Sequence, residues 1–288
     1  MYTIESRNVL TPQNGLNLYR GRTENSILLT ETPGADPMEI GVKYDAYELL
    51  DTALRNRRSK CVIMMGNLGD PYNPLEKEYK LTRKCLKVIE NNDFGVIITT
   101  RQNLILRDMD VITGISAKTR CLVELTFPSL DDEKLKKIEG EDTLSIEERL
   151  ELLQELKKAG IEVIATLYPM IPYVNDDENE LMGLLQELKL YGVSVVDLVD
   201  LRVAIKKSAR EFFYTEYEKR FPEQYKRFIS ENENKGELLA ADYRNKLKRV
   251  SELCERFGLM YDSRKIKAWK RQYENHTVGR QMELTDYL

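Results

Sequence analysis

The chain has 288 residues, of which 42% are hydrophobic and 32% are charged. A composition this rich in apolar residues can bury a large core and excludes an intrinsically disordered protein. We expect neither a membrane span nor a secretory leader, because no apolar run approaches the length of about 18 residues that a span requires. The formal net charge of −4 is unevenly distributed: residues 1–200 hold 24 basic and 34 acidic side chains, whereas residues 201–288 hold 20 and 14.

Short β-rich runs alternate with helical patterns through the first 200 residues. The first unit is expected to run from a strand near 26–30 into a helix over 44–57. Further strands are predicted at 61–65, 94–99, 121–126, 161–167 and 193–198. Continuous apolar strands that alternate with helices are typical of a parallel sheet covered by helices. About six such units are too few for a closed eight-stranded barrel, so we predict an α/β fold with a partial (βα)6 TIM-like barrel.

The helical patterns between the strands cover 74–92, 104–116, 131–138, 145–159 and 175–190. Three of them begin with the spacing of a capping box, in which a polar N-cap residue is followed by a glutamate three positions later. The pairs are Asn73 and Glu76, Ser145 and Glu148, and Asn175 and Glu178. We therefore interpret Glu76 as a helix cap rather than as a ligand contact.

After residue 202 the strand patterns stop and only helices are predicted, at 207–220, 222–232, 237–257 and 263–273. Pro222 is expected to begin a helix, because proline is not tolerated inside one. We predict a partial barrel over residues 1–203 and a C-terminal helical extension, not an independent domain, over residues 204–288. The aromatic side chains between 212 and 228 have near-helical spacing, which is typical of packing.

The basic balance of the C-terminal helices raises the hypothesis of a nucleic-acid surface, although solvated helical faces give the same count of charges. Trp269 lies among basic residues and is the best candidate for stacking on a base. The candidate nucleic-acid contacts are Arg264, Lys267, Trp269, Lys270 and Arg271.

Ligands of parallel α/β folds bind where the loops after the strands converge. The polar residues at the predicted strand ends give a candidate pocket that consists of Asn67, Asp70, Tyr72, Thr100, Arg101, Glu124, Thr126, Asp200 and Arg202. We expect Arg101 to pair with Glu124, Asp197 or Asp200. Two alternatives remain open: Asp70 belongs to a plain turn, and Glu124 points to the helix layer. A small metabolite or a nucleotide is the ligand expected in such a barrel mouth.

The soft metal ligands of the chain are few and scattered. They consist of His276 and four cysteines, Cys61, Cys85, Cys121 and Cys254. Their spacing gives no local metal clip, and free cysteines of this kind are typical small buried hydrophobes. The pattern is no disulfide framework, which favours a reducing cytoplasm. With one histidine, neither histidine-based catalysis nor zinc hydrolysis is expected, and we predict no metal site.

A series of short segments shares its order and spacing with one enzyme family. These segments are 15–21 (GLNLYRG), 70–76 (DPYNPLE), 81–83 (LTR), 106–108 (LRD), Arg149, 159–161 (AGI), 169–172 (PMIP) with 175–176 (ND), and 201–202 (LR). The series covers about residues 10–232 and resembles the spore photoproduct lyase-like radical S-adenosylmethionine (SAM) enzymes, also called the DNA repair photolyase family. The resemblance implies a partial (βα)6 barrel, which is also the fold predicted from the periodicity.

Enzymes of this family hold a [4Fe–4S] cluster on a Cys-x3-Cys-x2-Cys loop directly after the first segment, and the cluster cleaves SAM to a carbon radical. The resemblance places the three ligand positions on Arg22, Ser26 and Leu29. None of these side chains is a thiolate, the soft anionic ligand that iron requires here. Two other positions depart from the family as well: Arg101 stands where the family has lysine, and Glu124 stands where it has a small polar residue.

The resemblance therefore leads to a cluster-free paralogue, a pseudoenzyme with a degenerate iron–sulfur motif and a binding or regulatory role. No cofactor is predicted for it, although the family uses SAM and a [4Fe–4S] cluster. One alternative is an active enzyme that acts on a nucleic acid or peptide, either repurposed for other chemistry or completed by ligands from a partner. A second alternative is a nucleic-acid-binding module built on the basic C-terminal helices. No membrane partner is expected.

Overall fold

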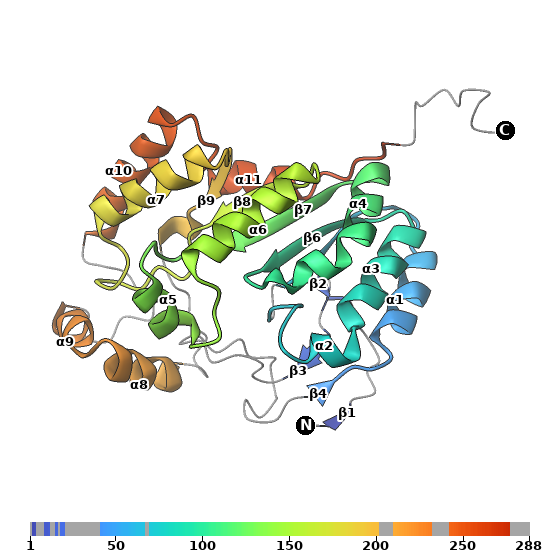
Figure 1. Cartoon of the computed structure of the whole chain (residues 1–288), viewed down its shortest axis with the longest axis horizontal. Helices are drawn as coiled ribbons and strands as arrows, with labels where there is room; N and C mark the ends of the chain where they lie inside the picture. Colours follow the sequence, from blue (N-terminus) through green and yellow to red (C-terminus); the bar gives the residue numbers. More distant parts are fainter. Residues whose placement is uncertain are drawn as a thin grey trace.

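The centre of the fold is a six-stranded sheet in which every strand runs parallel to its neighbours. The computed structural model describes residues 2–3, 9–11, 15–16, 18–20, 41–66, 69–201, 210–231 and 242–276. The strands of the sheet, from edge to edge, are β2 (Gly15–Leu16), β5 (Val62–Met65), β6 (Gly95–Thr100), β7 (Cys121–Thr126), β8 (Glu162–Thr166) and β9 (Val195–Asp197). Their order follows the chain and the sheet stays open, so the predicted partial barrel is confirmed (Figure 1).

A smaller sheet lies beside the first strand of the barrel. It pairs β4 (Gly41–Val42) in parallel with β1 (Tyr2–Thr3) and antiparallel with β3 (Tyr19–Arg20). The strand predicted near 26–30 lies outside the described residues.

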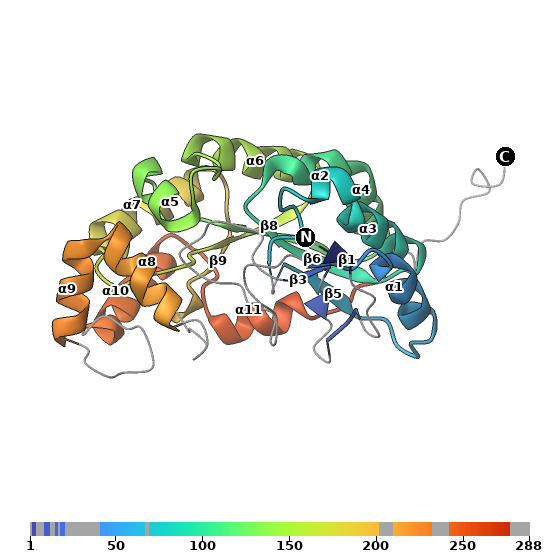
Figure 2. The same ribbon diagram turned by 90° about the horizontal axis from the view of Figure 1, so that it is seen from below.

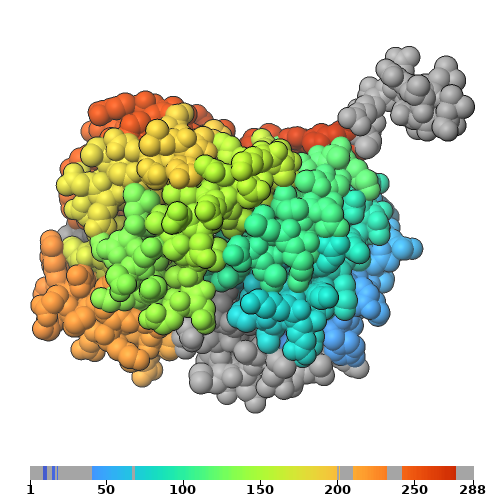
Figure 3. All heavy atoms as spheres, viewed as in Figure 1, coloured from blue at the N-terminus to red at the C-terminus, as the bar shows by residue number. Residues whose placement is uncertain are grey.

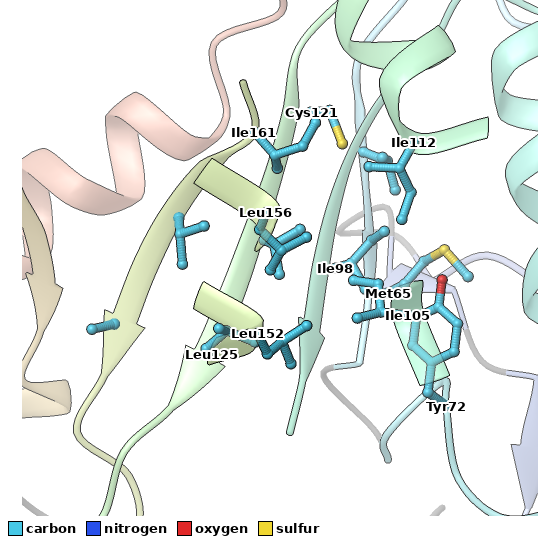
Figure 4. Packing of buried hydrophobic residues seen from close by; sticks show 14 of the residues in the cluster. Met65, Tyr72, Ile98, Ile105, Ile112, Cys121, Leu125, Leu152, Leu156 and Ile161 are labelled. Atoms are coloured by element: carbon cyan, nitrogen blue, oxygen red, sulfur yellow. The ribbon is translucent and has the colours of Figure 1, made fainter. Parts of the chain in front are cut away.

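One face of the large sheet is covered by the helices that connect its strands (Figures 1 and 3). They are α1 (Ala46–Arg55), α2 (Glu76–Tyr79), α3 (Leu81–Asn91), the 3-10 helix η1 (Asn103–Asp108), α4 (Met109–Lys118), α5 (Asp132–Glu139), α6 (Ile146–Lys158) and α7 (Glu178–Leu190). A further 3-10 helix, η2 (Val199–Leu201), follows the last strand β9. Side chains alternate along each strand, so Ile98 faces this helix layer and its neighbour Ile97 faces the opposite, concave side. Figure 4 shows Ile98 and Leu125 in one cluster with Leu152 and Leu156 of α6.

The predicted helix starts are only partly correct. Ser145 and Glu148 form both hydrogen bonds of a capping box at α6. At α7, by contrast, the N-cap is Asp177 rather than Asn175. The predicted helix 74–92 is divided into α2 and α3 at Lys80, whose φ of 51° lies in the left-handed region.

Glu76 is a buried ion-pair partner and does not form the capping box predicted with Asn73, which corrects our interpretation. Its side chain has no exposed area, and its Oε1 lies 2.8 Å from Nη2 of Arg107. Its other oxygen accepts a hydrogen bond from the backbone N–H of Thr82 (3.0 Å). Glu76 therefore joins α2, α3 and η1, a role that its distance from Asn73 in the sequence does not reveal.

The C-terminal helices are α8 (Arg210–Arg220), α9 (Pro222–Glu231), α10 (Tyr243–Arg256) and α11 (Ser263–Lys270). As predicted, Pro222 begins a helix and the aromatic side chains of α8 and α9 pack together. Their cluster includes Phe213, Tyr217 and Phe228. Helix α10 packs on α7, and its Cys254 belongs to the main hydrophobic cluster.

Helix α11 lies on the concave side of the sheet, opposite the helix layer (Figure 2). Its Ile266 is fully buried against a group of apolar strand residues, Val62, Ile97, Leu122, Ile164 and Val195. Backbone hydrogen bonds fix both ends of this segment: Met260 N–H donates to Ser194 O (2.8 Å), and His276 N–H donates to Lys118 O (2.9 Å). We call residues 260–276 the strap.

None of the described helices combines the length and the apolar character that a membrane crossing demands.

Candidate functional site

Two groups of polar side chains lie at the ends and on the concave face of the strands. The first, which we call the rim network, consists of Asp70, Thr100, Arg101, Glu139 and Arg149. The second, which we call the concave group, consists of Thr99, Glu124, Asp197 and Lys270. Both include residues from several strands or loops, so each depends on the assembled fold.

Asp70 connects the loops that follow β5 and β6. Its carboxylate accepts hydrogen bonds from the Thr100 hydroxyl (2.7 Å), the backbone N–H of Arg101 (2.9 Å) and the backbone N–H of Tyr72 (2.9 Å). Burial raises the pKa of the Asp70 carboxyl to about 6, against the opposing effect of these hydrogen bonds. The carboxylate of Asp70 thus holds two neighbouring loops of the barrel mouth together.

Glu139 is buried between two guanidinium groups. It forms an ion pair with Arg149, and its Oε1 lies 3.8 Å from Nη1 of Arg101. Burial alone would raise the pKa of the Glu139 carboxyl, but Arg149 and Arg101 together lower it below its usual value. Arg149 also donates to the carbonyl oxygen of Thr126 (2.6 Å), which fixes the end of β7.

Two of the three predicted partners of Arg101, Glu124 and Asp197, were therefore wrong. Arg101 pairs with Glu139, while Glu124 and Asp197 pair with a lysine of α11. The remaining predicted partner, Asp200, has a side chain outside the described part of the structure.

Glu124 points to the concave face, because its neighbours Val123 and Leu125 face the helices. Its Oε2 accepts a hydrogen bond from the Thr99 hydroxyl (2.5 Å), and its Oε1 accepts one from the Lys270 ammonium. The same ammonium reaches Oδ2 of Asp197 at 3.3 Å. Lys270 therefore joins β7 to β9 across the width of β8.

The two carboxylates also account for the charge state of Lys270. Burial alone would lower the pKa of its ammonium, but the charges and hydrogen bonds of Glu124 and Asp197 raise it above its usual value. Lys270 is therefore a cation at neutral pH.

A pocket of about 320 Å³ lies beside this ion pair, between the sheet and α11. The strands contribute Met64, Ile97, Glu124 and Asp197 to its lining, and η2 contributes Val199. Helix α11 contributes polar and basic side chains, Ser263, Lys267, Lys270 and Arg271 at its C-terminal end. The pocket is therefore apolar on part of its sheet side and charged on its helix side.

The structure brings together only some of the predicted pocket residues. Glu124 lines the pocket, whereas Asp70, Thr100 and Arg101 belong to the rim network with buried Tyr72 next to them. Thr126 contacts that network through Arg149. Asn67 and Arg202 lie outside the described residues, as do the positions that the family resemblance relates to cluster ligands, Arg22, Ser26 and Leu29.

Two of the five candidate nucleic-acid contacts are used inside the molecule instead. Lys270 is held by Glu124 and Asp197, and the Trp269 ring lies under the Arg120 guanidinium, 4.4 Å from ring centroid to Cζ. Arg264, Lys267 and Arg271 are exposed. We expected α11 to expose Trp269 for stacking beside a row of basic side chains. The structure shows that, of these candidate residues, only the basic side chains Arg264, Lys267 and Arg271 are exposed.

Sequence reasoning missed Glu139 and the pocket wall that α11 supplies. A signal for Glu139 existed, since an acidic residue in the last turn of a helix opposes the helix dipole and so indicates a specific partner. No local pattern indicates that Lys270 meets Glu124, because the two residues are separated by 146 positions.

The family model described as the radical SAM superfamily matches residues 36–185. An uncharacterized protein of Methanocaldococcus jannaschii is 32% identical over 178 residues, which cover 62% of this chain and 63% of the relative. An uncharacterized protein of Mycobacterium tuberculosis is 25% identical over 237 residues, which cover 81% of this chain and 68% of the relative. The chain thus spans less than two thirds of the length of the archaeal relative.

Solved structures of spore photoproduct lyase share the fold. One mutant of that enzyme matches 90% of this chain and 80% of its own with a TM-score of 0.66 at 16% sequence identity. The lyase complexed with a dinucleoside spore photoproduct matches with the same TM-score. Another mutant of the lyase carries bound AdoMet together with the dinucleoside. At this level of identity the likeness shows a common architecture, the open parallel barrel described above.

Proposed function

Because the chain belongs to the radical SAM superfamily, whose members use SAM and a [4Fe–4S] cluster, we propose that it is a cluster-free member with a binding or regulatory role. The observation that carries this proposal is the set of donors that the chain offers to iron. Clusters of this kind are held by cysteine thiolates. The chain has four cysteines, and none of them lies within its first 60 residues.

Three of the four cysteines do not fit a cluster, which leaves fewer than the three thiolates required. Cys85, Cys121 and Cys254 are buried in the hydrophobic core, on α3, β7 and α10. Burial raises the pKa of the Cys121 and Cys254 thiols to about 12, so neither is a thiolate at neutral pH. Across the described ranges, no three His, Cys, Asp or Glu side chains gather as a metal site. Arg22, Ser26 and Leu29 add no thiolate.

A binding role is supported by the barrel mouth itself. The rim network holds the loop ends in place through buried hydrogen bonds and ion pairs. The pocket beside Lys270 combines apolar and charged walls, which is typical of small-molecule sites. A fold that keeps such a site without cluster donors suits a protein that recognises a ligand and does no radical chemistry.

Anaerobic reconstitution with iron and sulfide tests the proposal. We expect the wild-type chain to retain no stoichiometric iron and to lack the visible absorbance of an iron–sulfur cluster. The matched control is the triple variant R22C/S26C/L29C, which restores three thiolates at the positions indicated by the family resemblance. Near-stoichiometric iron and sulfide in the wild-type chain would overturn the proposal.

The competing function is a radical enzyme whose missing ligands come from a partner. It makes a separate prediction, the release of 5′-deoxyadenosine from SAM under reducing conditions. Incubation of the wild-type chain with SAM, a strong reductant and cell extract, followed by chromatography of the nucleosides, measures that product directly. Its absence, with a bona fide radical SAM enzyme as the positive control, removes this alternative.

A further inference from the structure

The pocket between α11 and the sheet has the dimensions of a site for one small molecule. Its volume is about 320 Å³, and the strand residues Met64 and Ile97 give it an apolar surface. Pockets for small ligands begin at about 300 Å³ and combine apolar walls with a few polar groups. A pocket of this volume between helix and sheet therefore suits a small molecule.

The charged side chains of the pocket form an ion-paired group, in which two carboxylates and one ammonium leave a net charge of −1, and a second group that has no ion-pair partner among the described residues. Glu124 and Asp197 share the Lys270 ammonium. Lys267 and Arg271 line the same pocket from positions one helical turn apart on α11, where they face the same side. Among the described residues, neither makes an ion pair or a side-chain hydrogen bond. The pocket wall therefore carries two cations that are available to an anion.

Lys267 and Arg271 lie at the C-terminal end of α11, where the helix dipole stabilises positive charge. Lys270 is the last residue of the helix, and Arg271 is its C-cap. The negative end of the helix dipole favours cations there and offsets part of their mutual repulsion. The end of α11 is therefore a favourable place for the two cations.

We propose that this pocket binds a small phosphate monoester, with the phosphate held by Lys267 and Arg271. A phosphate monoester carries nearly two negative charges at pH 7 and so matches two cations, whereas a carboxylate supplies one. Guanidinium groups donate paired hydrogen bonds to phosphate oxygens, and an ammonium adds a compact charge. The site deepens the proposed binding role and rests on it.

The rest of the pocket selects what the phosphate is attached to. Glu124 and Asp197 each have lone pairs beyond those that contact Lys270, and these can accept hydrogen bonds from hydroxyl groups. Met64 and Ile97 offer an apolar surface to the carbon skeleton. The ligand class is therefore a hydroxyl-bearing phosphate ester, such as a sugar phosphate or a mononucleotide.

Isothermal titration calorimetry with ribose 5-phosphate tests the site, and ribose serves as the uncharged counterpart. The test variant is K267Q/R271Q, which removes both cations from the pocket wall. The matched control is R264Q/K265Q, because these residues lie on the same helix, do not line the pocket and lose the same charge. Both control positions keep their backbone hydrogen bonds to Asp262. Circular dichroism verifies that both variants are folded.

We expect the wild-type chain to bind ribose 5-phosphate more tightly than inorganic phosphate and not to bind ribose. K267Q/R271Q should weaken the affinity by at least about tenfold, the loss expected for charge-assisted hydrogen bonds, and R264Q/K265Q by less than about twofold. Titration with adenosine 5′-monophosphate shows whether the pocket prefers a mononucleotide or a sugar phosphate. Tighter binding of either ester than of inorganic phosphate supports the site.

Equal weakening in both double variants would indicate diffuse charge attraction and overturn the inference, as would the absence of binding for all three phosphate compounds. The two proposals fail separately. Iron uptake by the wild-type chain overturns the cluster-free function alone, whereas failure of the calorimetric test overturns the phosphate site alone.

Discussion

Asp70 is a carboxyl group that the barrel mouth keeps away from water. Burial disfavours its charged form more than its three hydrogen-bond donors favour it, so its pKa rises to about 6. Glu139 shows the opposite balance, since two guanidinium groups lower the pKa of that carboxyl despite complete burial. The two buried acids thus differ: burial outweighs the hydrogen bonds at Asp70, whereas Arg149 and Arg101 outweigh burial at Glu139.

The raised pKa of Asp70 gives a pH-dependent contribution to stability. A folded pKa of about 6 lies above the usual pKa of an aspartate, 3.8, so the contribution is fully present below that usual pKa and is lost as the pH rises through 6. Relative to the variant D70N, the free energy of unfolding of the wild-type chain should fall by about 2 kcal/mol between pH 4 and pH 7. Urea titrations at a series of pH values measure this difference.

The exposed N-cap Asp262 provides the control of opposite sign. Backbone hydrogen bonds from Lys265 and Arg264 lower the pKa of its carboxyl, so its stabilising contribution is present above the usual pKa and is lost on acidification. Relative to D262N, the wild-type chain should therefore gain stability as the pH rises from acid. The explanation of Asp70 would be wrong if both comparisons had the same slope.

At the scale of the elements, the turn after β5 allows no side chain at its first residue. Gly66 has a φ of +105°, and a Cβ placed there would lie 2.2 Å from the carbonyl oxygen of Thr99 on the neighbouring strand. Gly160, in the turn before β8, also has a positive φ of +76°, but an added Cβ would meet no atom within 4 Å. An alanine in place of Gly160 would thus add backbone strain alone, whereas an alanine in place of Gly66 would add strain and a steric clash.

This pair gives a matched prediction. Gly160→Ala should cost about 1 kcal/mol of unfolding free energy, which is the strain of a left-handed alanine. Gly66→Ala should cost at least about 3 kcal/mol, because the clash with a strand carbonyl adds a backbone shift to the same strain. Chemical denaturation of both variants measures the difference. Equal losses of unfolding free energy in the two variants would show that the backbone near Gly66 can shift at no cost, and would contradict this prediction.

The strand positions were predicted most accurately, and the boundaries between consecutive helices least accurately. Continuous apolar runs bounded by polar residues placed β7 at 121–126, as found, and the other predicted strands of the sheet within about two residues. The break at Lys80 could not be predicted, because lysine has no preference for the left-handed conformation. In the candidate site, alternation along β7 could place Glu124 on the concave side, but the sequence contains no signal for its distant partner on α11.

At the scale of the whole molecule, the strap closes the side of the sheet that the connecting helices leave open. Ile266 contributes a fully buried side chain, Lys270 a buried ion pair, and the two ends contribute backbone hydrogen bonds to β9 and to the end of α4. We propose on these grounds that residues 204–288 extend the barrel and do not form an independent domain.

Unfolding of the strap should therefore coincide with unfolding of the barrel. Trp269 is the only tryptophan of the chain, so its fluorescence reports on the strap while circular dichroism reports on all helices. Ile266→Ala should lower the unfolding free energy by about 2–4 kcal/mol and move both transitions together. Leu190→Ala, at a side chain that is 79% exposed, should change it by less than about 0.5 kcal/mol. If the fluorescence of Trp269 changed at a lower denaturant concentration than the circular dichroism signal, the strap would unfold before the barrel, and this prediction would be wrong.

The position of the strap in the chain has a consequence for biosynthesis. A ribosome makes all six strands of the large sheet before it makes α11, so the concave apolar surface around Ile97 and Leu122 lacks the cover of Ile266 until late in translation. Exposed apolar surface of this kind is what chaperones bind and what drives aggregation of incomplete chains. The nascent protein should therefore depend on chaperones until residues as far as 276 have left the exit tunnel, and should then become independent of them in one late step.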